Sequence, residues 1–303
     1  MKGGIVALVV ATAVALQLSS SSAAAAQRNS TVRAVSTPSM GVGPTAANYD
    51  VSCPKGQKAV GGGFNTVGIL VAGDLVPGGG PVPAVVPVVF ESRRLDSRTW
   101  RVTERAALNP AVASFAPNGT TVTASVYCRK VKGRVLARLE VGDVARPGSP
   151  PSTGDPSCPK RYVALSGGWS VSTGPETGFL YPSIYESFRD GRGAWRSSVA
   201  ANTESTADMI ALVYCSKERK PPRTRRLTGG SGSILVSCPK GLAAAAGGFK
   251  SAPGYVPTQS IGSSGGKKPS YPAVTAYPAG PVWMVGAGSF GPPLTTTAFA
   301  YCS

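Results

Sequence analysis

The stretch CPKGQKAVGGGF, residues 53–64, joins a Cys-Pro-Lys turn to a glycine pair and an aromatic residue eleven positions after the cysteine. The pattern returns at residues 158–169 and 238–249 with the same spacing, and each copy then reaches a tryptophan and ends on a Tyr-Cys pair. Such self-similarity indicates a threefold repeat. The repeated residues are Gly62, Gly63 and Phe64, Gly167, Gly168 and Trp169, and Gly247, Gly248 and Phe249; the tryptophans Trp100, Trp195 and Trp283; and the closing pairs Tyr127-Cys128, Tyr214-Cys215 and Tyr301-Cys302.

The six cysteines predict disulfides, because an even number that opens and closes each copy is typical of proteins from an oxidising compartment. Two pairings treat the copies alike: each unit closes on itself, or neighbouring units are linked. We favour closure within the unit, since cores of this size are marginal and a bridge over such a loop contributes about 4 kcal/mol. The favoured pairs are Cys53–Cys128, Cys158–Cys215 and Cys238–Cys302, and the linked alternative is Cys128–Cys158, Cys215–Cys238 and Cys53–Cys302.

Short strands separated by Gly and Pro predict an all-β fold of three tandem, disulfide-stapled antiparallel β units. The units either stand apart on linkers or share one core, and the sequence leaves both arrangements open. The expected boundaries are a signal peptide at 1–26, a flexible leader at 27–48, β repeats at 49–128, 154–215 and 233–303, and basic linkers at 129–153 and 216–232.

Three local features complete this expectation. Residues 68–87 form an insertion in unit one whose prolines argue against a helix or a central strand. In unit three we expect a hairpin from residues 273–277 and 282–290. Residues 131–139 are the one candidate helix, although Gly133 interrupts it.

The glycine pairs predict close packing, because glycine inside a strand is destabilising and needs a reason. We expect the aromatic residue that ends each glycine strand, such as Phe64, to pack over the glycines of a neighbouring strand. A phosphate-binding loop is the alternative use of such glycines. The pattern lacks the Lys-Ser/Thr and the helix that follow in that motif, so nucleotide binding is not expected.

The unit Cys-Pro-Lys-Gly, Gly-Gly-Phe, Trp and Tyr-Cys resembles a repeat of secreted, mostly uncharacterised bacterial proteins, and the resemblance covers residues 49–303. Unit two departs from it, since Arg161 replaces the turn glycine found as Gly56 and Gly241. The chain also resembles, more distantly, the vitelline membrane outer layer protein family, whose fold is a threefold β-prism. This second resemblance implies three small sheets around a pseudo-threefold axis and carries no activity with it.

Residues 1–26 predict a secretory signal. Lys2 supplies the positive start, residues 5–18 are almost entirely apolar, and Ala24-Ala25-Ala26 offers a cleavage site. The apolar run is shorter than the about 20 residues that span a bilayer. We therefore expect a secreted protein with no transmembrane segment after cleavage.

The chain is strongly basic, with 31 Lys and Arg against 14 Asp and Glu and a formal net charge of +17. This excess favours an anionic extracellular polymer or cell envelope as partner, although solvated linkers without a partner explain the same clusters. The clusters lack the interleaved aromatics of single-strand grooves, so no specific nucleic-acid recognition is expected. The candidate anion-binding residues are Arg129, Lys130, Lys132, Lys217, Arg219, Lys220, Arg223, Arg225 and Arg226.

The chain has no histidine, which excludes Ser-His-Asp and Cys-His catalysis and removes the commonest metal ligand. We expect no metal, no cofactor and no enzyme activity. Glu91 and Glu186 do hold equivalent places before their tryptophans, but unit three has Val274 at that offset. We expect these carboxylates to pair with Arg93 and Arg189 on a sheet surface.

These features predict a secreted, non-catalytic binding or structural protein that associates with anionic extracellular surfaces or polymers. The alternative is a lectin-like repeat protein in which Trp100, Trp195 and Trp283 stack on sugar rings, although a single tryptophan per unit also fits a core residue. A glycoside hydrolase that uses Glu91 and Glu186 ranks third.

Overall fold

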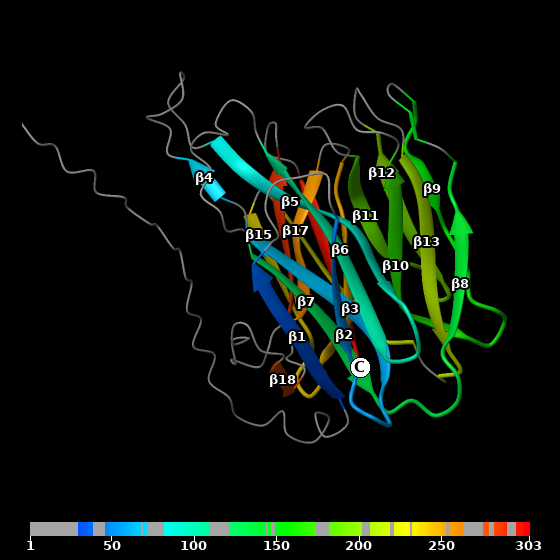
Figure 1. Cartoon of the computed structure of the whole chain (residues 1–303). Helices are drawn as coiled ribbons and strands as arrows, with labels where there is room; N and C mark the ends of the chain where they lie inside the picture. Colours follow the sequence, from blue (N-terminus) through cyan, green and yellow to red (C-terminus); the bar gives the residue numbers. More distant parts are fainter. Residues whose placement is uncertain are drawn as a thin grey trace, which may run out of the picture.

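The computed structural model describes residues 30–38, 46–67, 69–71, 82–108, 121–143, 145–146, 149–173, 182–201, 207–218, 221–230, 232–252, 255–262, 275–278, 282–289 and 295–303. Within these residues the regular structure consists of β-strands in three antiparallel sheets, which confirms the all-β prediction (Figure 1). The predicted signal peptide, residues 1–26, lies outside the described residues.

The second sheet shows the common plan in the order β2-β6-β5-β10-β13-β8, with a short β4 beside β5. Strands β2, β4, β5 and β6 come from unit one, β10 and β13 from unit two, and β8 from the segment between these units. Their bounds are β2 (Ala47–Ser52), β4 (Ile69–Val71), β5 (Val82–Arg94), β6 (Thr99–Leu108), β8 (Leu136–Val141), β10 (Val163–Thr173) and β13 (Ala207–Ser216).

The third sheet repeats this plan one unit later, in the order β14-β20-β16-β11-β12-β9. Strands β11 and β12 come from unit two, β9 from the segment just before its first cysteine, β16 and β20 from unit three, and β14 from the segment between them. Their bounds are β9 (Ser152–Gly154), β11 (Ser183–Asp190), β12 (Ala194–Ala200), β14 (Arg223–Gly229), β16 (Ala244–Lys250) and β20 (Thr296–Cys302).

The first sheet closes the series in the order β15-β19-β17-β3-β7-β1-β18. It combines the glycine and Tyr-Cys strands of unit one with strands of unit three, and it adds β18 outside β1. The bounds are β1 (Ser30–Pro38), β3 (Lys58–Val67), β7 (Thr121–Arg129), β15 (Gly232–Ser237), β17 (Tyr255–Gly262), β18 (Thr275–Pro278) and β19 (Val282–Ser289).

Every sheet therefore joins two units. The glycine strand of unit two pairs with a hairpin strand of unit one, that of unit three with a hairpin strand of unit two, and that of unit one with a hairpin strand of unit three. The exchange closes a ring with pseudo-threefold symmetry, so the arrangement with separate units on linkers is wrong. The partners across the three junctions are Trp169 with Ser92, Phe249 with Ser187, and Phe64 with Ser260.

The disulfides confirm closure within each unit. The bridges are Cys53–Cys128, Cys158–Cys215 and Cys238–Cys302, with Cα atoms 5.5, 5.6 and 5.7 Å apart. Each bridge ties the turn before a glycine strand to the Tyr-Cys strand beside it. The pairing that links neighbouring units is wrong.

The interior repeats one contact three times, a tryptophan ring laid on glycine. Trp100, Trp195 and Trp283 are at most 2% exposed, and a methyl group on the first glycine of the same unit would lie 2.1 to 2.3 Å from the ring. Only glycine fits there. The ring over the glycine thus belongs to the later tryptophan of the unit, so our prediction that the aromatic ending the glycine strand covers a neighbour's glycines is wrong. The first glycines are Gly62, Gly167 and Gly247.

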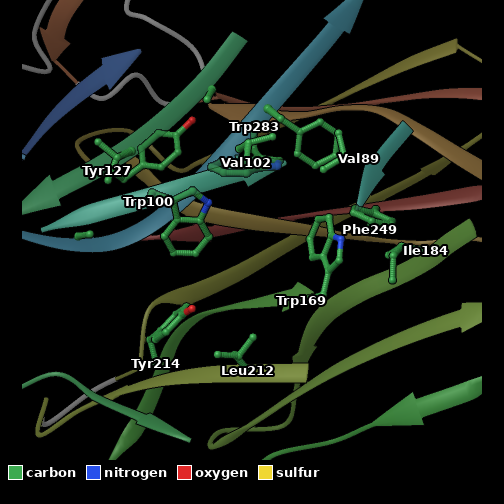
Figure 2. Close-up of a cluster of buried hydrophobic side chains, with 14 of the residues drawn as sticks. Val89, Trp100, Val102, Tyr127, Trp169, Ile184, Leu212, Tyr214, Phe249 and Trp283 are labelled. Carbon is green, nitrogen blue, oxygen red and sulfur yellow. The ribbon is translucent and has the colours of Figure 1, made fainter. Parts of the chain in front are cut away.

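Phe64, Trp169 and Phe249 meet one another instead. The Trp169 ring centroid lies 5.9 Å from that of Phe64 and 5.8 Å from that of Phe249, both edge to face. Figure 2 shows this buried cluster, with Trp100, Trp169 and Phe249 among the labelled side chains. The space left among these rings and glycines is about 10 Å³, which is enough for one water molecule.

Two local expectations about strands are wrong. Residues 82–87 belong to β5 despite Pro83 and Pro87, because that end of β5 extends beyond β10 and pairs with β6 and the short β4. In unit three the hairpin partner of β19 is β17, not residues 273–277; β18 pairs with β1.

The leader and both basic linkers also contain strands. β1, β8 and β14 occupy the same position in their sheets, each beside a Tyr-Cys strand. Accordingly these segments are not linkers throughout. The candidate helix at residues 131–139 is wrong: residues 136–141 form β8, in which apolar and polar residues alternate from Ala137 with the period of a strand.

Candidate functional site

The three tryptophans expected to stack on sugars are interior residues. Besides lying on glycine, their indole Nε1 atoms donate hydrogen bonds to the hydroxyls of Ser92, Ser187 and Ser260 at 3.1, 2.9 and 3.3 Å. Rings buried in this way present no face to a sugar in solution. The prediction of ligand stacking at Trp100, Trp195 and Trp283 is therefore wrong.

The predicted anion-binding residues divide into three groups. Arg129 is largely buried and forms an ion pair with Glu218, and burial lowers its pKa from the ordinary value. Arg219 and Lys220 lie outside the described residues. The others are exposed: Lys130 and Lys132 after β7, Lys217 after β13, and Arg223, Arg225 and Arg226 on β14.

Lys217 belongs to a basic hollow of about 740 Å³, which we call the unit-two hollow. Three segments line it: the turn at residues 158–162, residues 192–193 between β11 and β12, and residues 217–218 after β13. Its cations are Lys160, Arg161, Arg192 and Lys217, all exposed to solvent. The one carboxylate in the lining, Glu218, is paired with Arg129, so the hollow attracts anions.

Covalent and backbone bonds fix these walls relative to one another. The Cys158–Cys215 disulfide ties the turn to β13. The Cys158 N–H donates to the Gly193 carbonyl at 2.7 Å, and the Tyr162 N–H closes the turn on the Pro159 carbonyl at 3.0 Å. The Lys217 ammonium lies 5.5 Å from the centre of the Tyr162 ring, a cation-π contact. The cations are therefore carried by a rigid frame.

A comparison with unit one shows that unit two lacks one side chain beside the hollow. There the Cys53 N–H donates to the Arg98 carbonyl, as Cys158 does to Gly193, so these two positions are equivalent. The Arg98 guanidinium folds back and donates to the Cys53 carbonyl from Nε at 3.1 Å and from Nη2 at 2.7 Å. Unit two has glycine at this position, so no side chain fills the corresponding space.

Arg161 marks the same turn as unusual. Its φ is +74°, while the equivalent residues of the other turns, Gly56 and Gly241, have φ of +84° and +83°. Among the described residues Arg161 is the one non-glycine residue with positive φ. An L residue in this conformation costs about 1 kcal/mol relative to glycine. Unit two thus carries a cation at the rim of the hollow at the expense of backbone strain.

The carboxylates considered for glycoside hydrolysis are engaged elsewhere. Glu91 forms an ion pair of 2.5 Å with Arg93, as predicted. Glu186 does not pair with Arg189; it accepts from the Ser198 hydroxyl at 2.5 Å and lies 3.9 Å from Lys250 Nζ. Neither lines the unit-two hollow.

Arg189 instead supports the Tyr-Cys strand of unit three. Its backbone N–H donates to the Tyr301 hydroxyl at 2.6 Å, and its guanidinium lies 4.7 Å from the centre of that ring. Arg94 repeats the arrangement on Tyr214, at 2.8 and 4.6 Å. Burial raises the pKa of Tyr214 to about 12, and it raises the pKa of Tyr301 as well.

Sequence reasoning found Lys217 but missed the other cations of the hollow, Lys160, Arg161 and Arg192. One signal was visible, since Arg161 breaks the turn glycine of the repeat. The sequence did not show that Arg161 belongs to a basic hollow, because Gly193 and Lys217 come to lie beside it only in the folded chain.

No protein-family model matches the chain, and no curated protein matches it. The resemblances to secreted bacterial repeat proteins and to the vitelline membrane outer layer family stay predictions. In the part of the chain that the structure describes, no helix is long and apolar enough to cross a membrane.

Proposed function

We propose that this is a secreted, non-catalytic protein that binds anionic extracellular polymers through the unit-two hollow and the arginines of β14. The observation that carries the proposal is the hollow itself, a rigid space lined by four cations whose one carboxylate is already neutralised by Arg129. Three disulfides are compatible with secretion. The tryptophans of the lectin alternative are buried, and Glu91 of the hydrolase alternative is paired with Arg93, so the hollow is the better-supported binding site.

A polymer fits better than a single small anion. Arg223 follows Glu218 by five residues, so their Cα atoms are at most about 18 Å apart. Arg223, Arg225 and Arg226 are exposed on β14. A linear chain of phosphate or carboxylate groups seated in the hollow could therefore also contact β14.

The sharpest test is Gly193→Arg, which gives unit two the residue that unit one has at this position. Gly193 has no positive φ, and a methyl group there would come no closer than 3.8 Å to Cys158, so the variant should fold. An arginine that folds back as Arg98 does would occupy part of the hollow. We expect about tenfold weaker binding of linear polyphosphate in titration calorimetry at low salt, although the net charge rises by one. Unchanged or tighter binding would show that the hollow is not the site.

A matched pair of charge deletions separates the hollow from the overall charge. Arg146 is exposed, and its neighbour Ala145 bridges to Ala207 at the opposite end of β13 from Lys217, about 30 Å away. Arg161→Gln should weaken polyphosphate binding more than Arg146→Gln does. Equal losses would mean that net charge alone attracts the polymer. Arg161→Gly should also raise the free energy of unfolding by about 1 kcal/mol, because it relieves the positive φ.

A further inference from the structure

The edge strand β8 presents apolar side chains to solvent. Leu139 and Val141 are 64% and 63% exposed, the two highest values among the large hydrophobic side chains that the structure describes. Val141 lies opposite Ile210 and Leu139 opposite Leu212 across β8 and β13, so these four share one face of the sheet. Ile210 is itself 37% exposed. The apolar face therefore runs from β13 to the border of the sheet.

The backbone of β8 is also available for pairing. Among the described strands β8 is the last in the order of the second sheet and pairs with β13 alone, and Figure 1 places it at the border of the molecule. The equivalent strand of the first sheet, β1, has β7 on one side and β18 on the other. The fold thus accepts an additional antiparallel strand at this position.

We propose that two copies of the chain associate by antiparallel pairing of β8 with β8, with Leu139 on the two-fold axis. In this register Arg138 of each copy lies opposite Glu140 of the other, and Ala137 lies opposite Val141. Both cross-strand charge pairs are favourable, and the apolar faces of the two sheets become continuous. The occupant of this edge is therefore a second copy of the same chain.

Other registers are disfavoured. A shift of one residue would set the apolar face of one strand beside the polar face of the other. Centring the pair on Arg138 or on Glu140 sets two like charges directly against each other. The sequence of β8 thus favours one homotypic register, which is the property expected of a self-associating edge.

β14 provides an internal comparison, since it holds the same position in the third sheet. Arg223 lies opposite Cys302 as Leu136 lies opposite Cys215, so Arg225 corresponds to Arg138 and Leu227 to Glu140. Pairing β14 with itself brings arginine against arginine when it is centred on Thr224, Arg225 or Arg226. Centred on Leu227 it sets Arg225 opposite Gly229 and Arg226 opposite Thr228, so no arginine meets an opposite charge. Charges of one sign protect an edge strand from pairing, so we assign self-association to β8 only.

Salt dependence distinguishes this association from polymer binding. Each chain carries a formal net charge of +17, so two copies repel one another and salt screens the repulsion. The dimer should become tighter as salt rises, while binding of polyphosphate should become weaker.

The test uses sedimentation equilibrium on the whole protein at low and high salt. We expect a monomer–dimer equilibrium that Leu139→Arg shifts to monomer, whereas Leu227→Arg on β14 leaves it intact. Circular dichroism confirms that both variants keep the β fold. A wild-type monomer at every concentration and salt level would overturn the proposal.

Charge exchange tests the register itself. Arg138→Glu and Glu140→Arg should each be monomeric alone, because like charges then face one another, and mixing the two variants should give a heterodimer. The doubly exchanged chain should form a homodimer again. A dimer that neither single variant disrupts, or a mixture that stays monomeric, would contradict the antiparallel register centred on Leu139.

Discussion

The interior and the edges of this molecule differ in how faithfully they repeat. In the interior the same tryptophan-on-glycine contact occurs three times, and each indole donates to a serine hydroxyl on the hairpin of its own unit. At the edges β8 and β14 hold equivalent positions but share little chemistry, with Leu139 on one corresponding to Arg226 on the other. The repeat therefore specifies packing, and binding surfaces are to be sought where the copies diverge.

Physical constraint explains this difference. A side chain on Gly167 has no space, because the Trp195 ring already fills it, whereas a residue on β8 or β14 faces solvent. Interior substitutions should thus change stability and leave surface binding alone. Edge substitutions should do the opposite.

The largest effect is expected for Gly167→Ala. The new Cβ would lie 2.1 Å from Cγ of Trp195, so the ring or the strand must move. Overpacking of this kind costs about 3 kcal/mol, and a contact this close could cost more. Urea unfolding followed by tryptophan fluorescence should show the loss or a failure to fold.

Gly230→Ala is the control for this substitution. An added methyl group at Gly230 meets nothing within 4 Å, and its φ is not positive, so its stability should change by less than about 0.5 kcal/mol. Equal stability of the Gly167→Ala and Gly230→Ala proteins would refute the claim that the interior requires glycine.

A smaller effect on stability is expected at Tyr214, whose hydroxyl and ring are in contact with Arg94. Tyr214→Phe leaves the backbone N–H of Arg94 without its 2.8 Å acceptor, which should cost about 1 to 2 kcal/mol. The position that corresponds to Arg94 and Arg189 in the unit-three strand is Gly262, two residues after the serine acceptor in each case. The same variant at Tyr127 therefore tests whether the arginine contributes.

The pH dependence of stability gives Tyr214 a second signature. Its pKa is raised to about 12 by burial, so the folded state favours the neutral phenol. The stabilisation is complete below the unfolded pKa of about 10 and is lost as pH rises through the folded value, with a slope of up to about 1.4 kcal/mol per pH unit. Denaturant midpoints measured between about pH 9 and pH 11 should fall less steeply in Tyr214→Phe than in the wild type. Parallel slopes would contradict the shift.

The same division between interior and edge governs what the sequence could predict. The disulfide pairs and the all-β class followed from local spacing, because cysteine, glycine and tryptophan recur at fixed offsets within each unit. The pairing between units did not, since the alternation of β5 does not show that its second edge pairs with β10 of another unit. β17 was missed because residues 263–274 separate it from the later strands, and offsets measured from Trp283 therefore pointed to Val274.

The candidate site shows a similar limit. The excess of Lys and Arg predicted an affinity for anions but placed it in linkers, whereas the structure puts Arg223, Arg225 and Arg226 on an edge strand and buries Arg129 against Glu218. Gly193 lines the hollow, at the position where unit one has Arg98. In the sequence Gly193 is simply another turn residue.

The smallest effect on stability, and the most direct comparison of the two edges, is the pair Arg225→Gln and Arg138→Gln. Both positions are exposed and correspond in register, so each substitution should change the free energy of unfolding by less than about 0.5 kcal/mol.

The affinity for polyphosphate should differ between the Arg225→Gln and Arg138→Gln variants. On β14 the residue two positions on is Leu227, so Arg225 contributes an uncompensated charge; on β8 it is Glu140, which offsets Arg138. At low salt and low protein concentration, we expect Arg225→Gln to weaken binding about two- to threefold, the value of one exposed ion pair, and Arg138→Gln to leave it unchanged. Equal losses of affinity for polyphosphate in the two variants would mean that β14 binds the polymer no better than β8 does. The proposal that β14 takes part in polymer binding would then be wrong.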